Sequence, residues 1–429
     1  MPADLATYQS EQRNGPTATG LAFAVGFYFA FRSFITVLAV LLVGMDPRTG
    51  TAISLSIDYL LLLLTAFCAF GEVRYPFRKM MQLTTVRWVF LFLGVSCCSL
   101  FWTAAASLPS AIAYWCGMAA DAAIVIFSFR AGSLAETSGS FMTGFVWGAC
   151  AVAMIAWIMP AQSDLRLGVE DLLGPNQIGY LCAFAFFFAQ YLMRERRGKL
   201  HVQSLLLAVT MLRTLSKTTI AAFLVSQGFL LVSDKSISRR SKVYVAFAAA
   251  IVIAVCWGLL TSYYDIYTST GNQSETLSGR LGIWAYLLAE AVQQPWIGHG
   301  FDSVWKVIPP FGPDQFEAAH AHNELLQQFY AYGVVGIAMF AGVYFSFYRH
   351  IRRLTKGPFR TFLIAFLLFV LVRGTADTER FDLSLPMWAF VMFSLLIDQA
   401  CTIREDSTEL MAVVPIPFGN DSSPSLGLR

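Results

Sequence analysis

Residues 20–43, GLAFAVGFYFAFRSFITVLAVLLV, decide the fold class of this chain, because they form a long apolar run whose one charged residue is Arg32. About 20 apolar residues in a helix cross the roughly 30 Å hydrocarbon core of a bilayer. The run is therefore predicted to be a transmembrane helix. Of the chain's 429 residues 56% are hydrophobic and 13% charged, which makes lipid the main solvent, and a net charge of +3 gives no indication of a nucleic-acid partner.

Eleven further apolar segments follow, and together they predict an all-α integral membrane protein with about twelve transmembrane helices. The full set lies at 20–43, 53–70, 88–106, 111–128, 141–160, 177–193, 202–213, 218–233, 244–262, 329–348, 361–374 and 384–398. The pair within 202–233 consists of either two short spans or one broken helix.

The basic residues gather in four of the connections, and their placement predicts the orientation. The clusters are Arg74, Arg78, Lys79 and Arg87; Arg194, Arg196, Arg197 and Lys199; Lys235, Arg239, Arg240 and Lys242; and Arg349, Arg352, Arg353, Lys356 and Arg360. With twelve spans all four fall on one side, which the positive-inside rule makes cytoplasmic. Both termini then lie in the cytoplasm. A single span over 202–233 would move the later clusters to the other side, so the charges favour two spans.

This reading divides the chain into five parts. They are a cytoplasmic tail (1–19), transmembrane helices 1–9 (20–262), a long outer loop (263–328), transmembrane helices 10–12 (329–398) and a disordered cytoplasmic tail (399–429). A loop of some sixty residues is longer than a connector needs, so we expect it to be functional and to contain short helices.

Three charges lie within the predicted spans: Arg32 and Asp121 in the middle of theirs, and Asp58 near the outer end of its helix. Because a lone charge in hydrocarbon is costly, these groups are expected to face the bundle interior and to pair with one another. A structural ion pair is the favoured interpretation over a path for substrate or protons.

The first half of the outer loop contains a helix signal followed by glycines. Ser278 is a predicted N-cap for a helix from Gly279-Arg280 to Gln294, which Pro295 ends. Its apolar face, Leu281, Trp284, Ala285 and Leu288, suits the membrane surface or neighbouring helices. The glycines of Trp296-Ile-Gly298-His299-Gly300 permit a tight turn and a close backbone approach to a ligand.

The loop closes with His320-Ala-His322-Asn323-Glu324. Helical spacing places His322 in the first turn of the next helix, where the positive end of the helix dipole favours the neutral imidazole that a general base requires. Three alternatives stay open: a capping role for His322, a metal site with His320, or Glu324 or Glu290 as the base. No Cys or carboxylate completes a familiar ligand set, so no metal is expected.

Outer basic residues are few, and three of them can bind a phosphate at the membrane interface. These are Arg213 and Lys217, in the short turn between the paired spans, and Arg280 in the long loop. The alternative for each is a side chain that only reaches toward the headgroups.

These motifs resemble the O-antigen ligase and polymerase superfamily. The resemblance rests mainly on residues 278–336: Ser278-Gly-Arg280, Trp284, Pro295-Trp-Ile-Gly298-His-Gly300, His322-Asn323, Leu326, Gly333 and Gly336. Weaker similarities are Leu100-Phe-Trp102-Thr103 followed by Pro109, and Leu215-Ser216-Lys217-Thr218, where the family has Arg in place of Lys217. An ammonium is a point charge and not a bidentate fork, so diphosphate binding there is expected to be looser.

The resemblance implies a metal-independent, inverting glycosyltransferase of the GT-C-like class in the bacterial inner membrane, without a cofactor. Such enzymes move a glycan from undecaprenyl diphosphate, on the periplasmic side, to lipid A-core in ligases or to another repeat unit in polymerases. By this resemblance His322 is the general base or orients the acceptor, and Arg280 and Lys217, with Arg213, neutralise the diphosphate. The neighbours His320, Asn323 and Glu324 are expected to contact the substrates.

Two other classes compete with this prediction: a twelve-span transporter that uses Arg32 and Asp121, and a scaffold for envelope assembly with the loop as a docking surface. No internal repeat supports a transporter. The sequence does not separate a ligase from a polymerase.

Overall fold

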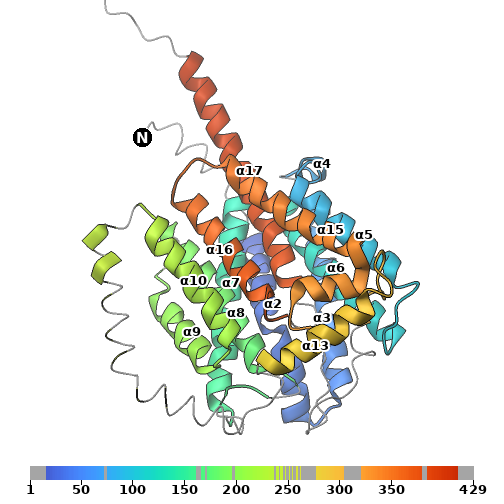
Figure 1. The fold of residues 1–429 in the computed structure, drawn as a ribbon. Helices are drawn as coiled ribbons and strands as arrows, with labels where there is room; N and C mark the ends of the chain where they lie inside the picture. The colour runs from blue at the N-terminus through green and yellow to red at the C-terminus, as the bar shows by residue number, and fades with distance from the viewer. Residues whose placement is uncertain are drawn as a thin grey trace, which may run out of the picture.

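The computed structural model describes residues 16–71, 75–160, 166–169, 172–195, 199–235, 238–240, 277–303, 320–378 and 384–413, with scattered residues between 242 and 261. Within these ranges every regular element is a helix, as Figure 1 shows. Six of the described helices are long and apolar enough to cross a membrane. The chain is therefore an all-α, multi-pass membrane protein.

The helices follow the predicted apolar segments. In chain order they are α2 (Pro16–Val43), α3 (Pro47–Gly71), α4 (Phe77–Met80), α5 (Thr84–Ser99), α6 (Leu108–Ala131), α7 (Leu134–Ile158), α8 (Pro175–Arg194), α9 (His201–Arg213), α10 (Lys217–Ser233), α13 (Leu277–Ala291), α15 (Glu324–Arg353), α16 (Pro358–Gly374) and α17 (Ser384–Val413). Each predicted span except 244–262, which lies mostly outside the described residues, overlaps one of these helices. Twelve spans remain a prediction, because the other described helices, including the shorter apolar α5 and α10, are not among the six.

The 202–233 region forms two separate helices, α9 and α10 (Figure 1). A turn of Thr214–Ser216 joins them, with Leu215 in the left-handed region at φ 53°. The helix α9 packs against α7 and α8, while α10 packs mainly against α16.

Glycines bring α2 and α7 into close contact. A Cβ added at Gly26 would lie 1.9 Å from the carbonyl oxygen of Phe141, and one at Gly144 would lie 2.0 Å from that of Phe23. Small residues of this kind let transmembrane helices approach closely, because lipid supplies no hydrophobic force between them.

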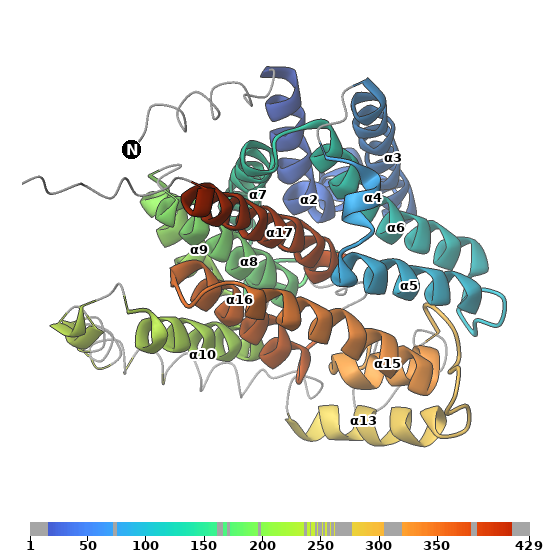
Figure 2. The same ribbon diagram turned by 90° about the horizontal axis from the view of Figure 1, so that it is seen from above.

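Aromatic rings fill the centre of the bundle. The buried Trp388 of α17 lies within 5.2–5.6 Å, centroid to centroid, of Phe29, Phe141 and Phe145 from α2 and α7. Figure 2 shows α17 running through the middle of the helices. This packing provides the frame on which the outer loops are held.

The predicted pairing of charges within the spans is confirmed for Arg32 and Asp121. The Arg32 guanidinium lies 2.5 Å from Oδ1 of the buried Asp121. Asp58 is also buried, but the prediction that it lies near the end of its helix is wrong. Since α3 begins at Pro47, six residues before the predicted span, Asp58 lies near its middle.

Candidate functional site

The helix α15 is broken at Gly333, where the backbone has φ 62° and ψ −153°. The segment 295–300 lies against the break and pairs with it. Gly300 N–H donates to the Ala331 carbonyl at 2.8 Å, and Val334 N–H donates to the Pro295 carbonyl at 2.8 Å. Backbone groups that the break leaves without helical partners are thus satisfied inside the protein, as a membrane-embedded chain requires.

The two glycines of this segment approach the chain itself, and the expected approach to a ligand stays a prediction. Gly298 and Gly300 have φ of 61° and 90°, which side-chain-bearing residues rarely adopt. A Cβ at Gly298 would lie 2.5 Å from the backbone of Ala331, and one at Gly300 would lie 2.4 Å from Cα of Thr103. The motif is therefore needed for packing between 295–300, α15 and the turn after α5.

The turn after α5 completes this block. Ala104 N–H donates to the His299 carbonyl at 2.8 Å, and Phe301 N–H donates to Oγ of Ser99 at 3.1 Å. The His299 ring stacks on Tyr330 with centroids 4.3 Å apart. Segments from three parts of the sequence are thereby fixed together beside the start of α15.

The predicted loop helix exists as α13, with ends that differ from those predicted. It begins at Leu277, so Ser278 lies inside it and is not the N-cap, and it ends at Ala291, before Gln294. After Ala291 the chain forms turns, and Pro295 then lies against the break in α15.

The face of α13 that packs on the protein is the row Ile283, Leu287 and Ala291, which lies against Tyr330. The predicted face is largely outward: Leu281 and Leu288 are each about half exposed, at 53% and 51%. The helix has two apolar rows, and the sequence pattern alone did not indicate which one α15 covers. Trp284 Nε1 donates to the Ala321 carbonyl at 2.9 Å and ties α13 to the histidine segment.

His322 precedes the helix and does not lie in its first turn, which corrects the prediction. Asn323 is the N-cap of α15, and its Oδ1 accepts from Leu326 N–H at 2.9 Å. Asn is a strongly preferred N-cap because its short side chain reaches the free N–H groups of the first turn. His322 therefore takes the position before the cap, with φ 50°, and its ring is buried against the rest of the site.

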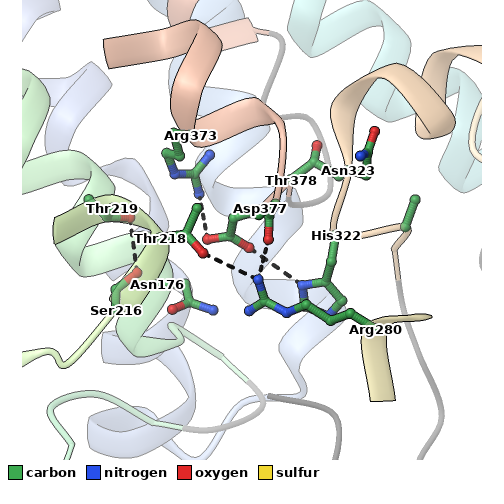
Figure 3. A network of polar contacts seen from close by, with 12 residues as sticks. Asn176, Ser216, Thr218, Thr219, Arg280, His322, Asn323, Arg373, Asp377 and Thr378 are labelled. Carbon is green, nitrogen blue, oxygen red and sulfur yellow. Dashed lines mark hydrogen bonds and ion pairs between the residues drawn. The ribbon is translucent and has the colours of Figure 1, made fainter. Parts of the chain in front are cut away.

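The short segment 375–378, which follows α16, connects the parts of the site (Figure 3). Each of its four residues contacts a different residue of the site. The Thr375 carbonyl accepts from Asn323 Nδ2 at 2.9 Å, the Ala376 carbonyl accepts from Arg280, Asp377 contacts His322, and the Thr378 hydroxyl donates to Glu324. Residues 322–324 are thus joined one by one to this segment, which we call the α16 turn.

Asp377 is the site residue that the sequence reasoning missed. Its Oδ1 lies 3.4 Å from Nδ1 of His322, and its Oδ2 lies 3.4 Å from the guanidinium of Arg373. Burial alone would raise the pKa of Asp377, but Arg373, the hydrogen bond to His322 and nearby Arg280 hold it well below its usual range. The carboxylate is therefore ionised and accepts only. The available signal was a carboxylate four residues after an arginine in the last outer connection.

Arg373 is itself enclosed. Its guanidinium lies 3.6 Å from the centroid of the Tyr180 ring, a cation–π contact from α8. Between Tyr180, Glu324 and Arg373 lies a cavity of about 10 Å³, room for a single water. The Arg373 guanidinium thus lies next to Oδ2 of Asp377, while Oδ1 of the same carboxylate faces His322.

Arg280 is brought to the same place, as predicted, and its partner on α10 is Thr218. The guanidinium is buried and donates to Oγ1 of Thr218 at 3.2 Å, as well as to the Ala376 carbonyl. Lys217, beside Thr218, is the exposed first residue of α10, and Arg213 is the half-buried last residue of α9. Their predicted contact with phosphate stays a prediction.

Both carboxylate oxygens of Glu324 take hydrogen bonds within the protein. The Thr378 hydroxyl donates to one, and Gln328 Nε2 donates to the other at 2.7 Å. This arrangement favours a role in holding α15 to the α16 turn over a role as the base.

His320 lies beside His322, with ring centroids 4.1 Å apart. Burial lowers the pKa of His320 well below its ordinary value, and neighbouring His322 lowers it further. Its Nε2 is buried, and among the described residues it has no hydrogen-bond partner. The ring is therefore neutral.

Donor atoms of His320, His322 and Asp377 lie within 4.8 Å of one another, a spacing that a metal ion can use. Two observations oppose a divalent cation there. Asp377 already contacts Arg373, and the guanidinium of Arg280 lies against the same turn. Two fixed positive charges repel a third.

Comparison with known proteins shows which family a part of this chain is similar to. Residues 202–341 match the model of a family described as O-antigen ligase, a range that contains Lys217, Arg280 and His322 but not Asp377. A curated relative, "O-antigen ligase" of Pseudomonas aeruginosa (strain PAO1), is 27% identical over 142 residues. That match covers 33% of this chain and 33% of the relative, so about a third of either protein is compared.

The region that matches contains α9, α10, α13 and the start of α15, which are the elements that carry the predicted cations and the histidine segment. The matched range therefore includes most of the sequence motifs at 278–336. Residues 202–341 of this chain are thus similar to the O-antigen ligase family.

Proposed function

We propose that this protein is a membrane glycosyltransferase that moves a glycan from undecaprenyl diphosphate to an acceptor hydroxyl on the periplasmic side of the bacterial inner membrane. The observation that carries the proposal is the meeting of His322, Asp377 and Arg280 at the α16 turn. A base, a carboxylate that orients it and a cation for a leaving group are the parts that glycan transfer requires.

The histidine acts as the general base. Because the Asp377 carboxylate only accepts, the His322 nitrogen that faces it, Nδ1, carries the hydrogen, and Nε2 keeps its lone pair. Nε2 removes the proton from the acceptor hydroxyl as that oxygen attacks the anomeric carbon of the donor. Asp377 then stabilises the imidazolium that forms.

The bond between the anomeric carbon and the diphosphate oxygen breaks on the opposite face of the sugar, so the configuration inverts. The electron pair leaves with the diphosphate, and Arg280 and Lys217, with Arg213, stabilise its charge. His320 and Asn323 contact the substrates beside His322. Binding of this charge at the edge of the bilayer supplies much of the catalysis, and no metal or cofactor is required.

Because the donor carries a lipid tail, the site lies at the surface of the membrane, next to its outer leaflet. In the proposed orientation both termini lie in the cytoplasm. The acceptor is lipid A-core for a ligase and another repeat unit for a polymerase. Similarity to a protein named O-antigen ligase favours the ligase.

Deletion of the gene in the source bacterium tests the function. Accumulation of lipid-linked polymer without attachment to lipid A-core indicates a ligase, and single capped repeats indicate a polymerase. Complementation with His322→Ala is expected to leave the defect, with normal protein level. A matched change at the exposed His201 of α9, His201→Ala, is expected to restore the glycans. Full complementation by His322→Ala would exclude the proposed base.

A further inference from the structure

A second arginine, outside the predicted site, is fully enclosed next to it. The Arg166 side chain lies before α8 and is 2% exposed. Its Nε donates to the Thr214 carbonyl at 3.0 Å, and Nη2 donates to Oδ1 of Asn176 at 3.0 Å. Arg166 therefore connects the start of α8 to the turn between α9 and α10. A buried cation is costly to desolvate, and these hydrogen bonds offset part of that cost.

The turn that Arg166 holds is strained. Leu215 has φ 53°, which costs free energy for a residue with a Cβ. Close packing from α8 adds a second constraint, because a Cβ at Gly179 would lie 2.8 Å from Oγ1 of Thr214. Strain of this kind persists where the surroundings determine the backbone fully.

The strained turn leads directly into the cation-bearing start of α10. Ser216, the N-cap of α10, donates from Oγ to Oγ1 of Thr219 at 2.9 Å. Thr218, two residues after Ser216, accepts the hydrogen bond from Arg280. Figure 3 shows Asn176, Ser216 and Thr218 on one side of the site, and Arg280 reaching toward Thr218 from the side of His322.

We infer that Arg166 is a positioning residue for the donor's diphosphate. Arg166 fixes the carbonyl of Thr214, and through the strained turn it sets the direction of Lys217 and Thr218. Because Thr218 accepts from Arg280, Arg166 also helps to position the guanidinium of Arg280. The inference rests on the proposed function, because it assigns the cations to a diphosphate.

The test is binding of undecaprenyl diphosphate, the proposed leaving group, to the purified full chain in lipid nanodiscs. Undecaprenol, which lacks the diphosphate, is the reference ligand. The wild type is expected to prefer the diphosphate, and Arg166→Gln is expected to reduce that preference about tenfold, since a misplaced clamp loses charge-assisted hydrogen bonds. Arg166→Lys, which keeps the charge and a donor, is expected to recover part of the loss.

Arg194 supplies a matched control. It lies at the other end of α8 and pairs with the buried Asp234 beyond α10 at 2.8 Å. Arg194→Gln removes a comparable interhelical arginine far from the α16 turn, so it is expected to lower stability without changing the diphosphate preference. Equal losses of preference in the Arg166 and Arg194 variants would show a purely structural role and overturn the inference.

A double-mutant cycle with Lys217→Gln separates positioning from general damage. If Arg166 acts through Lys217, its replacement costs less affinity once Lys217 is absent. Strict additivity, or an Arg166→Gln variant that binds like the wild type, would overturn the inference while the wild type's preference still supports the proposed function. A wild type that does not distinguish the two lipids would overturn both.

Discussion

Nδ1 of His322 lies 3.4 Å from Oδ1 of Asp377, and the other oxygen of that carboxylate faces Arg373 at the same distance. The three groups form a row of imidazole, carboxylate and guanidinium drawn from two segments that are 55 residues apart. At 3.4 Å the first contact is long for a hydrogen bond, and catalytic contacts of this kind commonly tighten when substrate binds. Since Arg373 keeps the carboxylate ionised in spite of its burial, the row fixes which nitrogen of His322 would face the proposed acceptor.

Asp377→Asn is expected to lower kcat for glycan transfer by about 10²-fold or more, because an amide neither fixes the tautomer nor stabilises the imidazolium. The donor KM should change little. Kinetics of purified protein with a lipid-linked donor measure both constants. Glu290→Gln serves as the control, since Glu290 is the alternative base of the loop, and it should keep its turnover. Loss of activity in the Glu290 variant alone would reverse the assignment.

Replacement of Gly333, at the break in α15, or of Gly298, in the segment that pairs with it, should destabilise the site. Gly333→Ala or Gly298→Ala adds a Cβ that lies 2.4–2.5 Å from backbone atoms of the opposing segment, in addition to an unfavourable φ. We expect each to cost about 2–4 kcal/mol of stability, from the conformational and packing penalties together. Thermal unfolding in detergent, followed by tryptophan fluorescence, measures the loss.

Gly282 gives the matched control for these variants. It lies in α13, where an added Cβ meets nothing within 4 Å. Gly282→Ala should leave the unfolding temperature unchanged or raise it slightly, because Ala favours a helix more than Gly does. If all three variants melted alike, the pairing of 295–300 with α15 would be unimportant for stability.

The Arg32–Asp121 pair distinguishes a structural role from a transport path. Removal of one partner, by Arg32→Met or Asp121→Leu, leaves an unpaired charge in the bundle and should cost about 3–5 kcal/mol. The combined Arg32→Met, Asp121→Leu variant should recover most of the loss in yield of folded protein, and it should transfer glycan at the wild-type rate. A folded double variant without transfer would show that the pair participates in function.

His320 should make stability depend on pH. Burial lowers its pKa in the folded protein, so below about pH 6.5, where an unperturbed imidazole gains a proton, the unfolded state binds more protons than the folded state. Stability is then fully present above about pH 6.5 and is lost as the pH falls below it. His320→Asn should show a smaller drop in unfolding temperature between about pH 7.5 and about pH 5.5. Equal drops in the two proteins would contradict this.

Much of the fold could be predicted from the sequence, because hydrophobic run length reports directly on membrane spans. The Arg32–Asp121 pair followed from the cost of burying a lone charge, although the two residues are far apart in the chain. Helix ends were less certain. The helix α13 was predicted to begin at Gly279 after Ser278 as its N-cap, but it begins at Leu277 and contains Ser278.

The site was predicted in part. Arg280 and His322 lie together at the α16 turn. The sequence motifs had predicted that both residues belong to one site. Asp377 was missed because its role arises from the docking of α16 against α15, which no local pattern encodes. His322 was placed inside the helix because spacing with Leu325 and Leu326 suits a first turn, while the capping preference of Asn323, which shifts the helix start by two residues, was not considered.

The α16 turn has a consequence for engineering. Its four successive residues each contact a different residue, so a one-residue insertion or deletion there would displace His322, Asp377 and Arg280 at once, while substitutions in distant connections would not. Chimaeras between such enzymes that exchange acceptor preference should therefore transfer 277–303, 320–336 and 373–378 as one cassette, and grafts that take only the histidine segment should be inactive.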